Sequence, residues 1–216
     1  FDDTFSLIPS RVEKICKGII ERKIDIGWNC MTRVDKINPE LLALMKKAGC
    51  YEIGFGIESG SDRVLQFIKK ATTTDAIKKG VKMTKEAGID VRGFFMIGFP
   101  TETREEVLRT IDFAKELDVD VAQFMVATPL PGTEMWEIAK QNGNINDDWN
   151  SFTFYAPEKM PFSSDLLNDR ELLSLYKRAY KSFYLRPKFI IKQLIKMKSA
   201  GDIYRNWLAA KGIMGF

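Results

Sequence analysis

The residues of this sequence best suited to chemistry lie directly after runs of apolar residues. Glu58 ends such a run at residues 50–57 and is followed by Ser59, Gly60 and Ser61. A plain turn into a helix explains Ser61 as an N-terminal cap, but it does not explain a carboxylate on the strand side of that turn. Ligands of parallel α/β folds bind at the carboxyl ends of strands, so we interpret Glu58 as a ligand-binding residue.

A second apolar run ends in a glycine, whereas the first ends in the charged residue Glu58. The apolar run at residues 93–98 ends in Ile97 and Gly98. A glycine at a strand end allows a flat ligand to approach the backbone closely, although a turn alone also uses glycine. Thr103 and Glu106 then have the spacing of a capping box, which predicts that a helix begins there.

Two more stretches hold polar or rigid residues. Two prolines stiffen the loop that begins with Thr128 and Pro129, either to direct its carbonyl groups into a cavity or to make a rigid turn before a helix. Asn29 and Arg33 follow the apolar run at residues 24–28. A guanidinium group such as that of Arg33 can pair with a ligand carboxylate, and an ion pair with a nearby acid is the alternative.

The composition excludes several kinds of catalysis within these residues. The 216 residues contain no histidine, which excludes histidine triads, histidine-ligated zinc and imidazole acid–base chemistry. The three cysteines, Cys16, Cys30 and Cys50, lie far apart in the sequence, so we interpret them as buried apolar side chains of a cytoplasmic protein. No apolar run approaches the roughly 20 residues of a membrane helix.

The elements that position these residues repeat along the chain. Each repeat is a helix with a Lys/Glu-rich end, a short turn and an apolar strand, with strands predicted at residues 24–28, 50–57, 89–98 and 119–126. Gly49 and Gly88 supply the left-handed residue that commonly ends a helix. Nearly continuous apolar strands that alternate with helices predict an α/β fold with a parallel sheet, as a barrel or a doubly wound sheet.

The pattern changes near residue 150, where we divide the chain into a partial barrel (1–150) and a C-terminal extension (151–216). Residues 151–165 lack a period and predict an irregular loop, and a helix is predicted at 169–185 before Pro187. From Leu167 onward the extension has 11 Lys and Arg against 3 Asp and Glu. We interpret it as an amphipathic helical cap; a nucleic-acid contact is the alternative.

In this order, the stretches resemble the radical S-adenosylmethionine (SAM) superfamily. The resemblance covers about residues 1–143, and its matching runs are 2–5, 33–35, 56–61, 97–103 and 129–133. The branch that it resembles often carries an upstream cobalamin-binding domain and includes the anaerobic magnesium-protoporphyrin monomethyl ester cyclases. It implies a partial (β/α)6 TIM-like barrel of parallel strands, entered at the end of its second strand.

The resemblance also implies cofactors: SAM, a [4Fe–4S] cluster whose cysteine ligands lie upstream of Phe1, and cobalamin from an upstream domain. Asp2 or Asp3 would lie near the SAM amino group. Glu58, with Ser59 beside it, would contact the ribose or methionine part, and Lys70 would meet the carboxylate. The remaining implied cofactor-binding residues are Ile97, Gly98, Thr128 and Pro129 around the adenine, and Asn29 and Arg33 facing the same cavity. The sequence departs from its relatives after Lys70, where they usually have glycine.

The implied activity is that of an iron–sulfur oxidoreductase that reductively cleaves SAM to a 5′-deoxyadenosyl radical. The radical would abstract hydrogen from a small-molecule substrate, with flavodoxin or ferredoxin as electron donor and no nucleic-acid partner. A lyase or aldolase barrel without iron is one alternative, but it needs a desolvated lysine at a strand end, and we expect Lys69 and Lys70 on a helix. A non-catalytic binding module is the other alternative.

Overall fold

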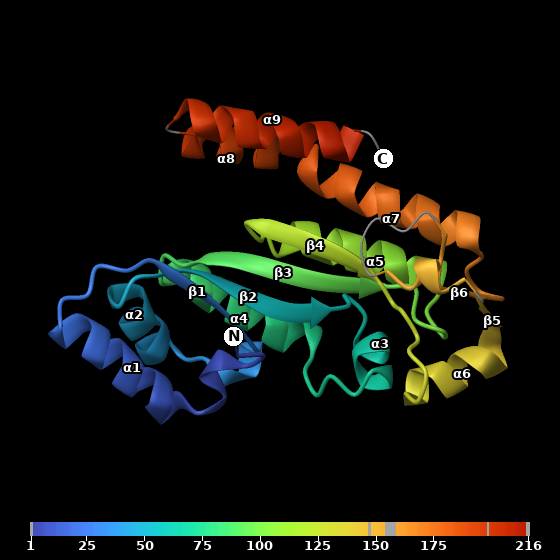
Figure 1. Ribbon diagram of the computed structural model, residues 1–216, viewed down its shortest axis with the longest axis horizontal. Coiled ribbons are helices and arrows are strands. Elements are labelled where there is room, and N and C mark those ends of the chain that lie inside the picture. Colours follow the sequence, from blue (N-terminus) through green and yellow to red (C-terminus); the bar gives the residue numbers. More distant parts are fainter. Residues whose placement is uncertain (1, 147, 154–158, 198, 215–216) are drawn as a thin grey trace. The chain divides into compact units, whose positions relative to one another are not determined.

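The computed structural model describes residues 2–146, 148–153, 159–197 and 199–214 (Figure 1). Contacts divide the chain into two compact units that alternate along the sequence. The first unit comprises Phe1–Met96 and Asp112–Gln123, and the second comprises Ile97–Ile111 and Phe124–Phe216. The boundary that composition suggests near residue 150 stays a prediction.

Four parallel strands form the main sheet in the order β1-β2-β3-β4, so the chain adds one strand after another as a barrel does. The strands are β1 (Trp28–Thr32), β2 (Cys50–Glu58), β3 (Asp90–Ile97) and β4 (Val121–Val126). The sequence predicted the last three to within two residues. Its prediction for residues 24–28 was wrong, because Ile24 and Ile26 are about half exposed and pairing with β2 begins at Trp28.

Helices connect the strands, as predicted. They are α1 (Pro9–Glu21), α2 (Pro39–Lys47), α3 (Asp62–Phe67), α4 (Thr74–Glu86) and α5 (Arg104–Glu116), with single 3-10 turns η1 (Phe5–Leu7) and η2 (Val34–Lys36). Gly49 and Gly88 have the predicted left-handed conformation after α2 and α4 (φ 92° and 73°). Lys23 and Asp118 adopt it after α1 and α5 (φ 53° and 49°), so the same helix ending recurs without glycine.

The first unit leaves one face of the sheet less covered than the other. Ile53, Phe55 and Ile57 alternate along β2 and are fully buried, whereas Glu52 and Glu58, on the opposite face, are partly exposed. Figure 1 shows α1, α2 and α4 on one side of β1, β2 and β3. The less covered face of β2 is therefore where polar side chains can meet a ligand.

The second unit contains the C-terminal helices. Its further elements are α6 (Glu134–Asn142), β5 (Gly143–Ile145), η3 (Trp149–Ser151), β6 (Phe162–Ser164), α7 (Asp169–Tyr184), α8 (Pro187–Lys196) and α9 (Ala200–Met214), with β5 and β6 antiparallel. The helix predicted at 169–185 and its break at Pro187 are confirmed. The Tyr180 hydroxyl donates to the Phe124 carbonyl (2.9 Å) and accepts from its N–H (3.2 Å), which occupies part of the edge of β4.

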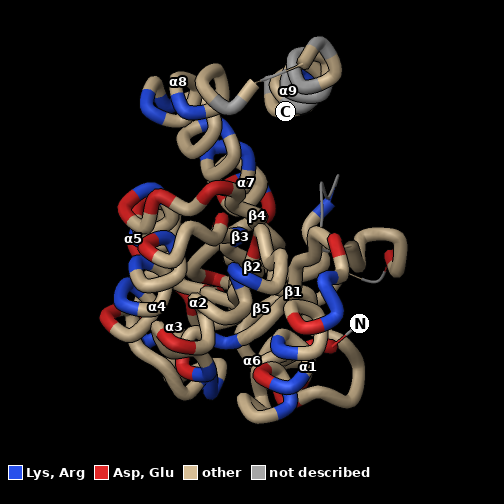
Figure 2. Tube along the Cα trace, turned by 90° about the vertical axis from the view of Figure 1, so that its left-hand side faces the viewer, with Lys and Arg blue, Asp and Glu red and all other residues tan. Residues whose placement is uncertain are grey.

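Helix α7 of the extension is amphipathic, as predicted, whereas α8 leaves Ile191, Leu194 and Ile195 exposed. Five residues of α7 are buried: Leu172, Leu175, Tyr176, Ala179 and Phe183. Figure 2 shows lysines and arginines along α7 and α8. No helix in the described ranges has both the length and the apolar character needed to cross a membrane.

Candidate active site

A carboxylate and an ammonium group meet at the carboxyl end of β2. The Lys70 Nζ lies 2.8 Å from the Glu58 Oε1, and the two side chains are 22% and 17% exposed. Glu58 itself has a left-handed backbone (φ 66°), and so has Ala71 (φ 51°) directly after Lys70. Lys69 (φ 55°) is also left-handed, but it repeats the helix ending found at Lys23 and Asp118. Each such non-glycine residue costs about 1–2 kcal/mol and such residues cluster at functional sites, so this geometry supports a ligand-binding role for the pair.

The structure corrects the expected setting of the two lysines. Helix α3 ends at Phe67, so Lys69 and Lys70 lie in the loop after it and not on a helix. Lys69 is exposed, whereas Lys70 reaches back to Glu58. The left-handed conformation of Ala71 also gives a physical reason for glycine at this position in relatives, because glycine adopts it without strain.

Gly56 makes room for this ion pair. A Cβ atom at Gly56 would lie 2.7 Å from both the Glu58 Oε1 and the Lys70 Nζ, so a side chain there would displace the pair. Arg33, which directly follows β1, joins the cluster, because its Nη2 donates to the Lys70 carbonyl (3.2 Å). Its Nε also donates to the Asp35 carboxylate (2.8 Å). Partial burial raises the pKa of Asp35, but the hydrogen bond and charge of Arg33 outweigh it and leave this pKa below its usual value.

The serines after Glu58 build the turn. Ser59 is fully buried, and its Oγ accepts a hydrogen bond from the Ser61 N–H (3.1 Å). Ser61 caps α3 by accepting from the Val64 N–H (3.5 Å), as the sequence predicted. The turn thus fixes the backbone from which Glu58 projects.

In the second unit, Glu102 organises the loop after β3. Its buried carboxylate oxygen Oε2 accepts hydrogen bonds from the N–H groups of Gly98 (2.6 Å) and Phe99 (3.2 Å). The predicted capping box is confirmed, since the Thr103 N–H donates to the Glu106 side chain (3.1 Å) and the Glu106 N–H to the Thr103 hydroxyl (3.3 Å). The carboxylate and the cap hold this loop in one conformation.

The two segments expected around the adenine are neighbours. The Ala127 N–H donates to the Ile97 carbonyl (2.8 Å), which brings the Thr128–Pro129 segment beside Gly98. Gly98 is left-handed (φ 86°), and a Cβ atom there would lie 2.6 Å from the Leu172 side chain. Leu172 fills that side of the glycine, so a ligand must approach this backbone from another side.

The remaining expected site residues form contacts of their own. Asp2 pairs with Arg11 (2.6 Å) on the surface, and Asp3 is exposed. Asn29 donates to the Tyr51 hydroxyl (2.8 Å), also on the surface. The structure therefore brings together Arg33, Glu58 and Lys70, and separately Ile97, Gly98, Thr128 and Pro129.

Sequence reasoning missed Glu102 and a second charge pair. Arg92 of β3 donates to both oxygens of Glu52 on β2 (3.0 and 3.2 Å), on the face that carries Glu58. The signal was present, since Glu52 and Glu58 lie six positions apart in an otherwise apolar strand and therefore share a face. Glu102 could have been found as an acid that closely follows a strand-end glycine.

The three cysteines are close in space although far apart in the sequence. Burial and the neighbouring Cys50 raise the pKa of the Cys16 thiol to about 11. A thiol hydrogen bond with Cys30, followed by burial, raises that of Cys50 further. No set of three or more metal-ligating side chains in the described ranges could hold a metal ion, so these residues do not fit a [4Fe–4S] cluster.

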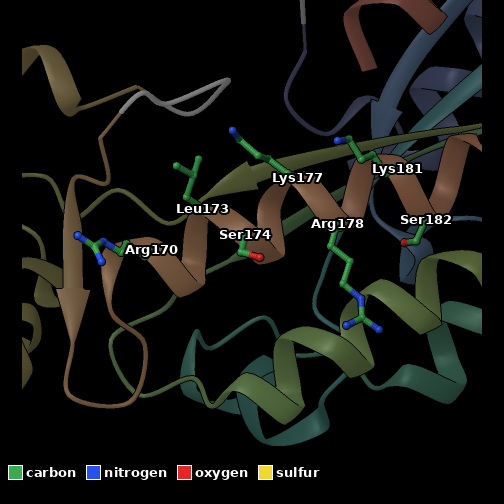
Figure 3. A pocket seen from close by; sticks show the side chains of 7 residues that line it. All are labelled: Arg170, Leu173, Ser174, Lys177, Arg178, Lys181 and Ser182. Carbon is green, nitrogen blue, oxygen red and sulfur yellow. The ribbon is translucent and has the colours of Figure 1, made fainter. Parts of the chain in front are cut away.

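A separate basic surface lies along α7. A cavity of about 730 Å³ is lined by Arg170, Leu173, Ser174, Lys177, Arg178, Lys181 and Ser182. Figure 3 shows Lys177 and Lys181 pointing the same way from the helix. These residues face away from the apolar side of α7, as expected for an amphipathic cap.

Comparison with known proteins identifies the class. The family described as the radical SAM superfamily matches residues 3–114. An uncharacterized methyltransferase of Pyrococcus horikoshii is 42% identical over 198 residues, which are 90% of this chain and 42% of that protein. The anaerobic magnesium-protoporphyrin IX monomethyl ester cyclase of Rubrivivax gelatinosus is 26% identical over 94% of this chain and 36% of its own length.

A solved structure of a radical SAM enzyme is also similar to this chain. The radical SAM methyltransferase TsrM of Kitasatospora setae, with cobalamin and a [4Fe–4S] cluster bound, has a TM-score of 0.58 and 25% identity over 65% of this chain and 30% of its own. The α/β sheet and the family match together define a partial radical SAM barrel. This chain belongs to the radical SAM superfamily, whose members use SAM and a [4Fe–4S] cluster. It spans less than half the length of each of these relatives.

Proposed function

We propose that this chain is the part of a radical SAM enzyme that binds SAM for reductive cleavage. The observation that carries the proposal is the Glu58–Lys70 pair at the carboxyl end of β2, with the left-handed non-glycine residues Glu58 and Ala71 at or beside it. A carboxylate and an ammonium group 2.8 Å apart complement a ligand that itself carries an amino and a carboxylate group. The methionine part of SAM is such a ligand.

The residues have distinct roles in this proposal. Lys70 binds the SAM carboxylate, Glu58 accepts hydrogen bonds from the amino or ribose hydroxyl groups, and Arg33 holds the Lys70 backbone. The loop that Glu102 fixes and the Thr128–Pro129 segment present backbone groups to the adenine. When bound, SAM and a [4Fe–4S] cluster would supply the chemistry, the one-electron reductive cleavage of a carbon–sulfur bond of SAM that leads to hydrogen abstraction from the substrate, and these residues would hold SAM in place for it.

The test uses the full-length protein from its natural gene, reconstituted anaerobically with iron and sulfide. SAM and dithionite are added, and 5′-deoxyadenosine is quantified over a range of SAM concentrations. Lys70→Met and Glu58→Gln should raise the KM for SAM about tenfold or more, since losing one partner of a hydrogen-bonded charge pair costs at least this much. Lys69→Met, which removes an exposed neighbouring charge, is the matched control and should leave the KM unchanged.

Two outcomes would contradict the proposal. One is full iron incorporation without 5′-deoxyadenosine or any other SAM-derived product. The other is an equal loss in the Lys69 and Lys70 variants, which would show that Lys70 has no specific role.

A second candidate for the overall reaction is methyl transfer. The relative that covers 90% of this chain at 42% identity is named a methyltransferase, and so is TsrM. Transfer of the methyl group of SAM leaves S-adenosylhomocysteine, so the same assay separates the reactions. S-adenosylhomocysteine as the main product favours methyl transfer, and 5′-deoxyadenosine alone favours hydrogen abstraction without it.

A further inference from the structure

A small cavity with aromatic walls lies between α6 and the segment that follows it. Its volume is about 320 Å³, and it is lined by Trp136, Lys140, Gly143, Asn144, Ile145, Asn146 and Trp149. Small-molecule pockets start at about 300 Å³, so this cavity suits a ligand of one or two fused rings. Neither the family match nor the Glu58–Lys70 site accounts for it.

The aromatic walls form a platform that is held in place yet exposed. The rings of Trp136 and Trp149 are nearly parallel (11°), with centroids 6.3 Å apart. The Phe152 ring lies on Trp149 as well, with its centroid 4.7 Å from the Trp149 centroid. Trp149 is nevertheless 62% exposed. Two ring contacts fix the orientation of Trp149, so a flat ligand can stack on its open surface without ordering a mobile side chain.

The cavity also carries a positive charge. The Lys140 Nζ lies 5.4 Å from the centre of the Trp136 ring and 3.3 Å from the Glu137 carboxylate. That ion pair is exposed on both sides, with side chains 52% and 62% accessible, and such pairs contribute little. Lys140 can therefore turn to an anionic ligand, and the exposed Asn144 adds an amide at the rim.

The place of the cavity in the chain connects it to the proposed cofactor loop. Helix α6 begins at Glu134, directly after the loop of residues 127–133 that ends β4. Trp136 and Lys140 lie in its first two turns. Ligands of parallel α/β folds bind at this end of the strands, where a substrate must meet the reacting cofactor.

We propose that Trp136, Lys140 and Trp149 bind a planar aromatic ligand that carries a carboxylate. Trp149 supplies the stacking surface, Lys140 pairs with the carboxylate, and the β5 backbone closes the cavity. That this ligand is the substrate rests on the proposed function, whereas the binding site itself does not.

The test measures binding by isothermal titration calorimetry on the full-length protein without added SAM. Three probes separate the features: 2-naphthoate is flat and anionic, 2-naphthamide is flat and neutral, and decalin-2-carboxylate is anionic but not flat. We expect 2-naphthoate to bind about tenfold more tightly than decalin-2-carboxylate, because stacking on an aromatic side chain is worth about that much. It should bind about two- to fivefold more tightly than the amide, the effect of one exposed ion pair.

Variants assign these differences to residues. Trp149→Leu should lower 2-naphthoate affinity about tenfold, Trp149→Phe should restore most of it, and Lys140→Gln should abolish the preference over the amide. Trp207→Leu is the matched control in α9, because the Trp207 side chain is similarly exposed (56%). Its ring centroid lies 6.2 Å from that of Tyr204 and 5.6 Å from the Lys211 Nζ, so it too has an aromatic and a cationic neighbour. It should bind 2-naphthoate like the parent.

Three results would overturn the proposal: no 2-naphthoate binding, unchanged affinity in Trp149→Leu, or an equal loss in Trp207→Leu. Its failure is distinct from that of the proposed function. Binding of 2-naphthoate with no product from SAM keeps the cavity and removes the enzyme assignment. Cleavage of SAM without 2-naphthoate binding keeps the enzyme assignment and removes the proposed aromatic binding site.

Discussion

Removal of the Glu102 carboxylate tests whether one buried acid organises the loop after β3. Its Oε2 accepts two backbone hydrogen bonds, from Gly98 (2.6 Å) and Phe99 (3.2 Å), and the side chain is fully buried. A hydrogen bond to a charged group contributes about 1.5–3 kcal/mol. Glu102→Ala breaks two of them and leaves both N–H groups without this acceptor, so it should lower the free energy of unfolding by about 3–5 kcal/mol.

Two further variants make the test specific. Glu102→Gln keeps a carbonyl oxygen where Oε2 lies and loses only the charge, so it should cost about 1–2 kcal/mol. Glu105→Ala removes an exposed acid from the same region and should stay within about 0.5 kcal/mol of the parent. The measurement is urea unfolding followed by circular dichroism, with the slope against urea checked for each variant.

The order of the three variants decides the outcome. A loss that is greatest for Glu102→Ala, smaller for Glu102→Gln and negligible for Glu105→Ala supports the loop contacts. A Glu102→Ala protein as stable as the parent would refute them.

Two other predictions concern backbone strain and pH. Ala71 and Lys23 are left-handed (φ 51° and 53°), so Ala71→Gly and Lys23→Gly should each raise the melting temperature by relieving about 1 kcal/mol of strain, less the entropy that glycine loses on folding; a lower melting temperature would contradict this. Burial and Cys50 raise the folded pKa of Cys16 to about 11, whereas an unfolded thiol ionises near pH 8.5. The buried, protonated thiol therefore contributes about 3 kcal/mol to the free energy of unfolding. This contribution is complete below about pH 8.5 and is lost as the pH rises toward 11. Cys16→Ala should reduce this alkaline loss in urea unfolding at several pH values, while the part due to Cys50 remains; an unchanged slope would contradict the assignment.

The sequence alone determined the order of the elements and several of the helix ends. Nearly continuous apolar runs that alternate with amphipathic helices indicate parallel strands covered by helices. The bounds of β2, β3 and β4 were therefore predicted to within two residues. Gly49, Gly88, Ser61 and the Thr103–Glu106 box act locally, over three or four residues, and were also predicted correctly. Such features depend on neighbours in the chain.

Tertiary structure decided which residues meet across the sheet. The start of β1 depended on pairing with β2, and exposed Ile24 and Ile26 gave a false strand signal. The partners of Glu52, Glu58 and Cys50 are 40, 12 and 20 residues away in the sequence: Arg92, Lys70 and Cys30. Their contacts arise because parallel strands and the loops beyond them bring distant segments side by side, and that registry is set by packing of the whole sheet.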